Sequence, residues 1–312
     1  FGPIEDFKGE IVAASVMDDG FVEGNFLGLA DSGGNSDVNI ASIPYELTTS
    51  YGQGTAEGPA ACIIASGQVE LFDDLLGEEL PAGAVIRTVE PWNGEGNSLQ
   101  EQLDGIGKYA EKQYSSGAFP IFLGGEHGML PGILRGCPQK VTLIQIDAHA
   151  DLRDELDGEP YSHACAIARS LDEGAIGVHQ VGIRAYCSQE RDYIENDERV
   201  NTWFAKDVMS PITGPKKWDE WIEAISKIEG PVHLTVDIDG LDGSLVPATG
   251  TPVPGGLSFW HVVQTIETAF ANCEVISADV NEIVPQKDTP LTQFTAAMIA
   301  TKITAAFIAN RS

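Results

Sequence analysis

Runs of apolar and β-branched residues alternate along this chain with stretches in which apolar residues recur every three or four positions. The second pattern predicts amphipathic helices over 97–113, 217–228 and 258–270, with Ser258 as the N-cap of the last. The first pattern predicts strands near 38–45, 84–91, 118–123, 141–147, 178–184, 199–204, 231–238 and 274–280. Such alternation is typical of an α/β fold, with a mostly parallel sheet covered by helices on both faces.

No position along the chain looks like a boundary between domains. The 34 glycines and 17 prolines are spread between the predicted elements, and no repeat is visible. We therefore expect residues 1–312 to form one domain. Lys302 interrupts the apolar stretch 294–310, which leaves it short of the roughly 20 residues of a membrane span. The start of the chain shows no secretory leader, and we expect no association with a membrane.

Charge and cysteine content narrow the possible partners and the compartment. With 47 acidic against 18 basic residues, the formal charge of −29 repels nucleic acid but does not oppose a cationic ligand. The same charge is typical of a strongly solvated surface, such as that of a salt-adapted protein. The five cysteines are widely separated and form no CxxC pair, which indicates a reducing, cytoplasmic environment rather than a disulfide framework.

Acidic residues follow two of the apolar runs at a spacing of two. In VTLIQIDAHADLRD the run ends in Asp147, His149 and Asp151, and in HLTVDIDGLDG it ends in Asp237 and Asp239. Side chains two apart on an extended backbone face the same way. Carboxylates gathered beside a buried strand are costly unless a cation neutralises them, so the two clusters predict two metal ions.

Three of the six histidines lie in or beside motifs that follow predicted strands. His127 follows two glycines in LGGEHG, and His149 lies inside the DAHAD cluster as an imidazole ligand would. His163, in PYSHAC, is too far along the chain to be assigned as a ligand by spacing, and an acid or base at the rim is the alternative. The other three are interpreted as structural: His179, His233 and His261.

The donor types indicate which metal and which chemistry to expect. Two imidazoles and four carboxylates, without thiolates, favour a borderline-hard ion such as manganese. Two ions sharing this set need bridging carboxylates, and they supply a water that loses its proton easily and attacks an electrophile. A two-metal phosphoesterase would satisfy the same ligand chemistry.

The ordered set of motifs is more specific than any one of them. GGEH, DAHAD, SHAC and DIDGLDGSLVPATGTPVPGGLS, preceded by SIPYELTTSYGQGTAEGP and followed by DVNEIVP, resembles the ureohydrolase family of arginases and agmatinases over nearly the whole chain. The resemblance implies the three-layer α/β/α arginase-type fold, with a sheet of about eight strands. It also implies a binuclear manganese site with two Mn²⁺ per chain, and hydrolysis of a guanidino group to release urea. A phosphoesterase would leave this order of motifs unexplained.

The resemblance also assigns roles to individual residues. It implies that Asp147 and Asp237 bridge the two ions, that Glu282 pairs with the guanidinium, and that His163 passes a proton to the leaving amine. The remaining ligands would be His127 and Asp151 on one ion, which makes Asp151 part of the catalytic set, and His149 and Asp239 on the other. Asp242 and Asp279 are candidates for turns or for contacts behind the ligands.

Departures from the arginase pattern bear on the substrate. Gly128 stands where arginases have Ser or Thr, Arg153 stands in place of an Asn, and Ala185 replaces a carboxylate that binds the substrate's α-amino group. These features look more like agmatinases, which predicts conversion of agmatine to putrescine and urea in polyamine biosynthesis. Arg153 is either structural or a contact for a substrate carboxylate, which would favour guanidinobutyrate.

Other substrates and one other class of protein stay open. Guanidinobutyrate, guanidinopropionate, arginine and guanidine are alternative small guanidino substrates for the same chemistry. A non-catalytic metal-binding relative would release no urea from any of them. Relatives are commonly trimers or hexamers, so we expect a homo-oligomer.

Overall fold

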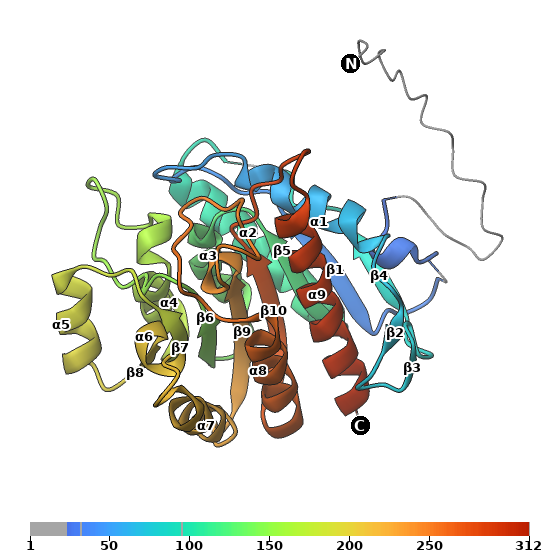
Figure 1. The fold of residues 1–312 in the computed structure, drawn as a ribbon. Coiled ribbons are helices and arrows are strands. Elements are labelled where there is room, and N and C mark those ends of the chain that lie inside the picture. The colour runs from blue at the N-terminus through green and yellow to red at the C-terminus, as the bar shows by residue number, and fades with distance from the viewer. Residues whose placement is uncertain (1–23, 32, 95, 312) are drawn as a thin grey trace, which may run out of the picture.

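The computed structural model describes residues 24–31, 33–94 and 96–311 of the chain. Its centre is an eight-stranded sheet in the order β4-β1-β5-β10-β9-β6-β7-β8 (Figure 1). Every neighbouring pair of strands in this sheet is parallel. The strands are β1 (Val38–Ile43), β4 (Ile86–Val89), β5 (Phe119–Gly124), β6 (Val141–Ile146), β7 (Ala175–Ile183), β8 (Val200–Phe204), β9 (Pro231–Asp237) and β10 (Glu274–Asn281).

Helices cover both faces of the sheet and give three layers (Figure 1). One face carries α1 (Gly58–Ser66), α7 (Gly214–Ile225), α8 (Phe259–Asn272) and α9 (Leu291–Asn310), whose apolar residues join one core cluster with the strands. The other face carries α2 (Leu99–Ser115), α3 (Leu130–Gly136) and α4 (Ala166–Glu173). The short helices α5 (Ser188–Asn196) and α6 (Ala205–Val208) lie near the β8 edge.

All eight predicted strands and the three predicted helices are confirmed. Ser258 is the N-cap of α8, because its hydroxyl accepts a hydrogen bond from the backbone N–H of His261. The sequence did not predict the small hairpin of β2 (Phe72–Asp73) and β3 (Glu78–Glu79). The five cysteines are unpaired, as expected.

Helix α9 corrects the reading of the apolar stretch near the end of the chain. Its 20 residues are long and apolar enough to cross a membrane by length and composition, so Lys302 does not shorten it as predicted. However, 72% of its most apolar window is buried, against α1, α8 and the sheet. Lys302 remains at its edge and pairs with Asp73 at 2.7 Å. Helix α9 is thus a core helix of the α/β/α layers.

The fold brings the ends of four central strands to one edge. Strands β5, β10, β9 and β6 are neighbours in that order. Ile146 lies beside Val236 and Asn281 beside Asp237, so the residues that follow these strands start at the same level. In open parallel sheets, ligands bind in the crevice outside these carboxyl ends.

Candidate metal centre and active site

Each of the four central strands delivers polar side chains to this edge. Strand β6 is followed by the DAHAD segment, and β9 ends at Asp237, after which a 3₁₀ turn, Ile238–Gly240, presents Asp239. A 3₁₀ turn after β5, His127–Met129, presents His127. Strand β10 is followed directly by Glu282. Residues more than a hundred positions apart in sequence therefore meet at one place.

One histidine and two carboxylates form a first group that can hold a metal ion. Nδ1 of His127 lies 2.9 Å from Oδ2 of Asp151 and 3.2 Å from Oδ2 of Asp147, and all three residues are buried. Despite these distances, Nδ1 of His127 has no hydrogen-bond partner. A buried polar atom aimed at two carboxylates without a hydrogen bond is the arrangement expected of a ligand atom that faces a cation, so the residues fit a metal ion.

A second group shares Asp147 with the first. Nδ1 of His149 lies 3.0 Å from Oδ2 of Asp239 and 3.7 Å from Oδ1 of Asp147, so the two oxygens of Asp147 face different histidines. Oδ2 of Asp237 lies 3.7 Å from Nδ1 of His127. The structure thus brings all six predicted ligand residues together, with Asp147 between the two groups.

The electrostatics of the cluster indicate an unbalanced negative charge. Burial, together with the charge of Asp147, raises the pKa of Asp151 to about 7. Burial, Asp239 and Asp147 raise the pKa of Asp237 well above its usual value. The pKa of Asp147 itself is raised by burial but lowered further by His127 and His149, so that it falls below its usual value. Divalent cations in the two groups would remove the cost of these buried charges.

A row of polar side chains on neighbouring strands supports the ligands from beneath. Gln145 donates to Oδ2 of Asp147 at 2.8 Å. Thr235, beside Gln145 in the sheet, lies 2.9 Å from Nε2 of His127 and donates to Asp279 at 3.0 Å. These contacts leave Nδ1 of His127 available to a metal ion and fix the orientation of its ring. The sequence signal is a polar residue inside an otherwise apolar strand, which our reading passed over except at Asp279.

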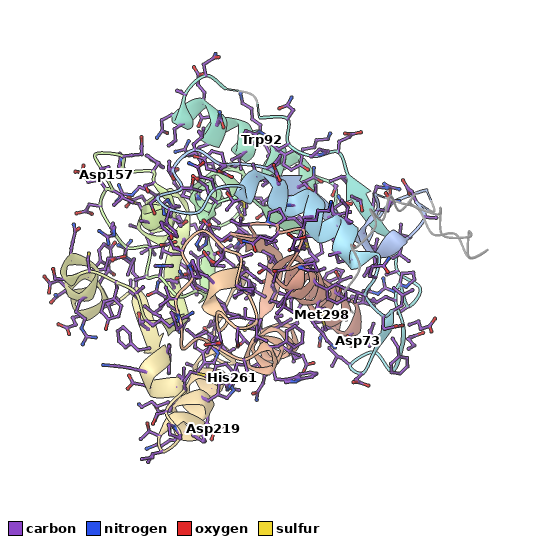
Figure 2. The ribbon with its side chains drawn as sticks, turned by 45° about the horizontal axis from the view of Figure 1, so that its top comes forward. Asp73, Trp92, Asp157, Asp219, His261 and Met298 are labelled. Carbon is purple, nitrogen blue, oxygen red and sulfur yellow. The ribbon has the colours of Figure 1, made fainter. Side chains whose placement is uncertain are left out.

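The three histidines interpreted as structural lie away from the two ligand groups. His233 is fully buried, with its nitrogens 2.7 Å from Ser277 and from Asp279. His261 belongs to the capping box of α8 (Figure 2), and His179 stacks on Trp203.

Glu282 and His163 line a narrow slot next to the ligands. Together with Gly52, Gly250 and the exposed Tyr51 they surround a space of about 10 Å³. Oε1 of Glu282 accepts a hydrogen bond from the backbone N–H of His127 at 2.7 Å, and burial raises the pKa of this carboxyl to about 8. Burial lowers the pKa of His163, so its imidazole is neutral at neutral pH.

The sequence reading missed Glu126 and Thr48. Glu126, of the GGEHG motif, is fully buried, and its oxygens accept hydrogen bonds from the backbone N–H groups of Leu47 and Thr48 and from the Thr48 hydroxyl. Burial raises the pKa of Glu126, and these hydrogen bonds oppose that rise. The only sequence signal was a carboxylate next to His127, which is weak in a chain with this many acidic residues.

The remaining candidates lie at the rim. Nε of Arg153 is 3.7 Å from Oε2 of the buried Glu190, which supports a structural role more than contact with a substrate. Ala185 forms a parallel bridge with His149, so it lies beside the second ligand group. Asp242 closes a turn by accepting hydrogen bonds from Ser244, Gly255 and Gly256.

The protein is an α/β/α protein in which two groups of histidine and aspartate lie at the carboxyl edge of a parallel sheet. The model of the arginase family matches residues 36–306, and the chain belongs to that family. It is therefore a hydrolase of the ureohydrolase type.

The chain is similar to proteins named as N(1)-aminopropylagmatine ureohydrolases and agmatinases. It is 33% identical over 280 residues to the N(1)-aminopropylagmatine ureohydrolase of Synechocystis sp., covering 85% of this chain and 87% of the relative. It is 33% identical over 259 residues to the agmatinase of Bacillus anthracis, covering 81% and 85%. The agmatine ureohydrolase of Thermoplasma volcanium has a similar structure, with a TM-score of 0.76, 28% identity and coverage of 89% of this chain and 93% of that one.

Proposed function

We propose that this protein hydrolyses the guanidino group of a small, agmatine-like cation to urea and an amine, using two Mn²⁺ ions per chain. The observation that carries the proposal is Nδ1 of His127, which is buried, faces Asp147 and Asp151, and makes no hydrogen bond. A second group around His149 shares Asp147, and Glu282, which lines the slot with His163, accepts a hydrogen bond from the backbone N–H of His127.

Manganese suits the donors that the chain provides. The proposed ligand atoms are imidazole nitrogens and carboxylate oxygens. A ligand set without thiolates favours a harder ion than the zinc of thiolate-containing structural sites. The residues that would hold the ions are His127, Asp147, His149, Asp151, Asp237 and Asp239. When bound, the two ions supply a water molecule whose pKa lies near neutrality, and thereby the nucleophile.

The slot residues bind the substrate and handle its protons in this proposal. The free oxygen of Glu282 lies next to Gly250, where a β-carbon would come within 3.1 Å of it, so the carboxylate can reach the slot and pair with a planar guanidinium. His163 is neutral and lies beside Ser50, so it can take up a proton and return it to the leaving amine. For hydrolysis to occur, Glu282 must hold the guanidinium carbon above the ligand groups and within reach of His163.

The substrate follows from what the rim lacks. Ala185, next to His149, offers no carboxylate to an α-amino group, and Arg153 lies 3.7 Å from the carboxylate of Glu190. Agmatine is arginine without its carboxylate, so these losses matter to arginine and not to agmatine. We therefore propose agmatine, with putrescine and urea as products. The relatives named for N(1)-aminopropylagmatine favour this longer cation as the second candidate.

Urea release from a panel of substrates tests the proposal. The manganese-loaded protein is assayed with agmatine, N(1)-aminopropylagmatine, arginine, guanidinobutyrate, guanidinopropionate and guanidine. We expect kcat/KM for agmatine or its aminopropyl derivative to exceed that for arginine by at least roughly 100-fold, the scale of one or two lost charged contacts. A lead for guanidinobutyrate would make Arg153 a carboxylate anchor, and a lead for arginine would contradict our reading of Ala185. No urea from any compound would indicate a non-catalytic relative.

We also propose a setting for this activity. The free cysteines and the family suggest a cytoplasmic homo-oligomer, a trimer or hexamer, that acts in polyamine biosynthesis and binds neither nucleic acid nor membranes. Exposed apolar side chains such as Ile212 and Trp260 are compatible with contact between subunits. Light scattering coupled to size-exclusion chromatography measures the oligomeric state, and a monomer at micromolar concentration would contradict this part.

A further inference from the structure

Glu126, in the loop after β5, accepts hydrogen bonds from the loop after β1, and Thr48 of that loop contacts His163. The Glu126 side chain is fully buried although nothing in the proposed chemistry uses it. Oε2 accepts hydrogen bonds from the backbone N–H groups of Leu47 at 3.0 Å and Thr48 at 2.7 Å. Oε1 accepts a hydrogen bond from the Thr48 hydroxyl at 2.7 Å. A buried carboxylate with this many donors holds the Thr48 side chain in one orientation.

The Thr48 hydroxyl in turn has a fixed direction. A hydroxyl has one proton and two acceptor positions, and here the proton goes to Glu126. One acceptor position takes the backbone N–H of His163 at 2.8 Å. Nδ1 of His163 lies 3.3 Å from the same oxygen, which has one acceptor position left for it, and 3.4 Å from the Ser162 hydroxyl, which can also accept. Only a protonated Nδ1 makes a hydrogen bond with an oxygen that has already given its proton away.

We propose that Glu126 and Thr48 are positioning residues that hold His163 as the neutral tautomer with its proton on Nδ1 and its lone pair on Nε2. Nε2 is the nitrogen next to Ser50, at 3.3 Å, among the residues that line the slot. In this tautomer Nε2 takes up a proton during hydrolysis and delivers it to the leaving amine. The consequence for turnover rests on the proposed function, whereas the tautomer itself does not.

Gly128 belongs to the same arrangement. Its φ lies outside the range that favours glycine, so the backbone does not demand glycine there. A β-carbon at this position would come within 3.0 Å of Oε1 of Glu126 and 3.4 Å of the backbone nitrogen of His163. A side chain at position 128 would therefore require the Glu126 carboxylate to shift by a small distance.

Nitrogen NMR of histidine tests the tautomer directly. The full chain, labelled with ¹⁵N at histidine and loaded with the diamagnetic ion Zn²⁺, is measured near pH 8, and His163→Asn identifies the His163 signals. We expect a protonated Nδ1 and an unprotonated Nε2 in the wild-type protein. A wild-type spectrum with the proton on Nε2 overturns the proposal.

Glu126→Gln gives the sharpest contrast because it keeps the size of the side chain. Its oxygen can accept from the two backbone N–H groups, and its amide then donates to the Thr48 oxygen, so the Thr48 proton turns to Nδ1 of His163. We expect the proton of His163 to move to Nε2, and kcat to fall by about 10²–10⁴-fold with KM little changed. An unchanged tautomer in a folded Glu126→Gln protein contradicts the proposal.

Thr48→Val and Thr48→Ser form a matched pair in case Glu126→Gln does not fold. Valine keeps the shape but removes the oxygen, and we expect loss of the Nδ1-protonated tautomer, with two metals per chain retained. Serine keeps the hydroxyl and should restore both the tautomer and most of kcat. If Thr48→Val instead loses metal while His163 keeps its tautomer, the residues serve the ligand loop and not His163. If the tautomers respond as expected but no variant or wild type releases urea, the proposed function fails and this inference stands.

A double-mutant cycle tests the part played by Gly128. Gly128→Ser should disturb the tautomer of His163 by pushing Glu126 aside. Glu126→Asp shortens the carboxylate by one methylene, so Glu126→Asp combined with Gly128→Ser should recover part of the loss caused by either change. Effects that simply add would show that the two positions are independent.

Discussion

Two residues of the candidate site combine an unfavourable backbone conformation with a buried carboxyl group. Asp151 and Glu282 have positive φ angles, 54° and 62°, which residues other than glycine rarely adopt. Both carboxyls are also buried, with raised pKa values of about 7 and about 8. Strain and buried charge of this kind persist only where the surrounding structure enforces them, and they are typical of functional sites.

Asp237→Asn should weaken both proposed metal sites, because it keeps the shape of a shared ligand but removes its charge. We expect fewer than two manganese ions per chain, measured by inductively coupled plasma spectrometry, and loss of turnover. Asp219→Asn is the control, since Asp219 is an exposed residue of α7 at the periphery of the molecule (Figure 2). Two ions and normal activity in Asp237→Asn would refute the assignment.

His163→Ala should behave in the opposite way. His163 lies in the slot and contacts Thr48 and Ser50 rather than the carboxylates, so its removal should leave two ions in place. Turnover should fall on the order of 10²–10⁴-fold if the imidazole acts as an acid or base. Loss of metal from this variant would make His163 a ligand instead.

The sequence indicated the proposed ligands but not the residues that hold them. Asp147, His149 and Asp237 lie at or just after the ends of apolar strands, which is a local signal. Thr48 and Glu126 are 78 positions apart, and an ordinary threonine gives no sign that it will meet a buried glutamate. Such partners are determined by how two loops pack, and a single sequence does not contain that information.

At the scale of elements, the loops after β7 and β9 are held by one side chain. The guanidinium of Arg184 donates to the backbone oxygens of Asp239 at 2.7 Å, Leu241 at 3.0 Å and Val253 at 2.6 Å. The planar group reaches several carbonyls at once because its donors point in fixed directions. Arg184 therefore supports the backbone that carries Asp239, a proposed ligand.

Arg184→Lys should loosen this loop while keeping the charge. A lysine has a single nitrogen and cannot span the same set of carbonyls. We expect the variant to fold but to bind manganese more weakly, by about 10–100-fold, the usual effect of losing a group that supports a ligand. Isothermal titration calorimetry with Mn²⁺ measures the change in affinity. The same affinity as the wild type would mean that the loop keeps its shape without Arg184.

Strands were easier to predict than helices in this protein, for a physical reason. A strand buried on both faces, such as β6, is an almost continuous apolar run. Helix α3 has no such pattern, because it is short and contains Gly132 and Gly136. These glycines let α3 approach α2 closely, since a β-carbon on Gly136 would come within 2.2 Å of the Gly107 oxygen. The order of the strands likewise depends on packing across the sheet and not on local pattern.

At the scale of the whole molecule, the metal ions and the stability of the fold should be linked. Glu282 and Asp151 have pKa values of about 8 and about 7 in the folded, metal-free chain, well above the roughly 4 of an unfolded chain. Between about pH 4 and pH 8 the folded state thus binds more protons at these groups than the unfolded state does. Their contribution to the free energy of unfolding is favourable at low pH and is lost as the pH rises.

Removing the metal should therefore cost more stability at pH 8 than at pH 6. With ions bound, the carboxylates are neutralised without protons, and the ions also stabilise the folded state by mass action. We expect the gap in Tm between the manganese-loaded and the chelator-treated protein to narrow as the pH falls from 8 to 6, as measured by differential scanning calorimetry at constant salt.

Protons also compete with metal ions for the ligands, which weakens metal binding at low pH. Glu282→Gln separates this competition from the effect of the buried carboxyl on stability. Glu282 is not among the proposed ligands, so the variant should still bind two ions, but it no longer carries a carboxyl that ionises between pH 6 and 8. The Tm of the metal-free variant should depend less steeply on pH over this range than that of the metal-free wild type. Equal slopes of Tm against pH in the two metal-free proteins would show that ionisation of Glu282 does not destabilise the metal-free site. A difference in Tm between the metal-loaded and metal-free wild type that does not depend on pH would contradict the link between the metals and the buried carboxylates.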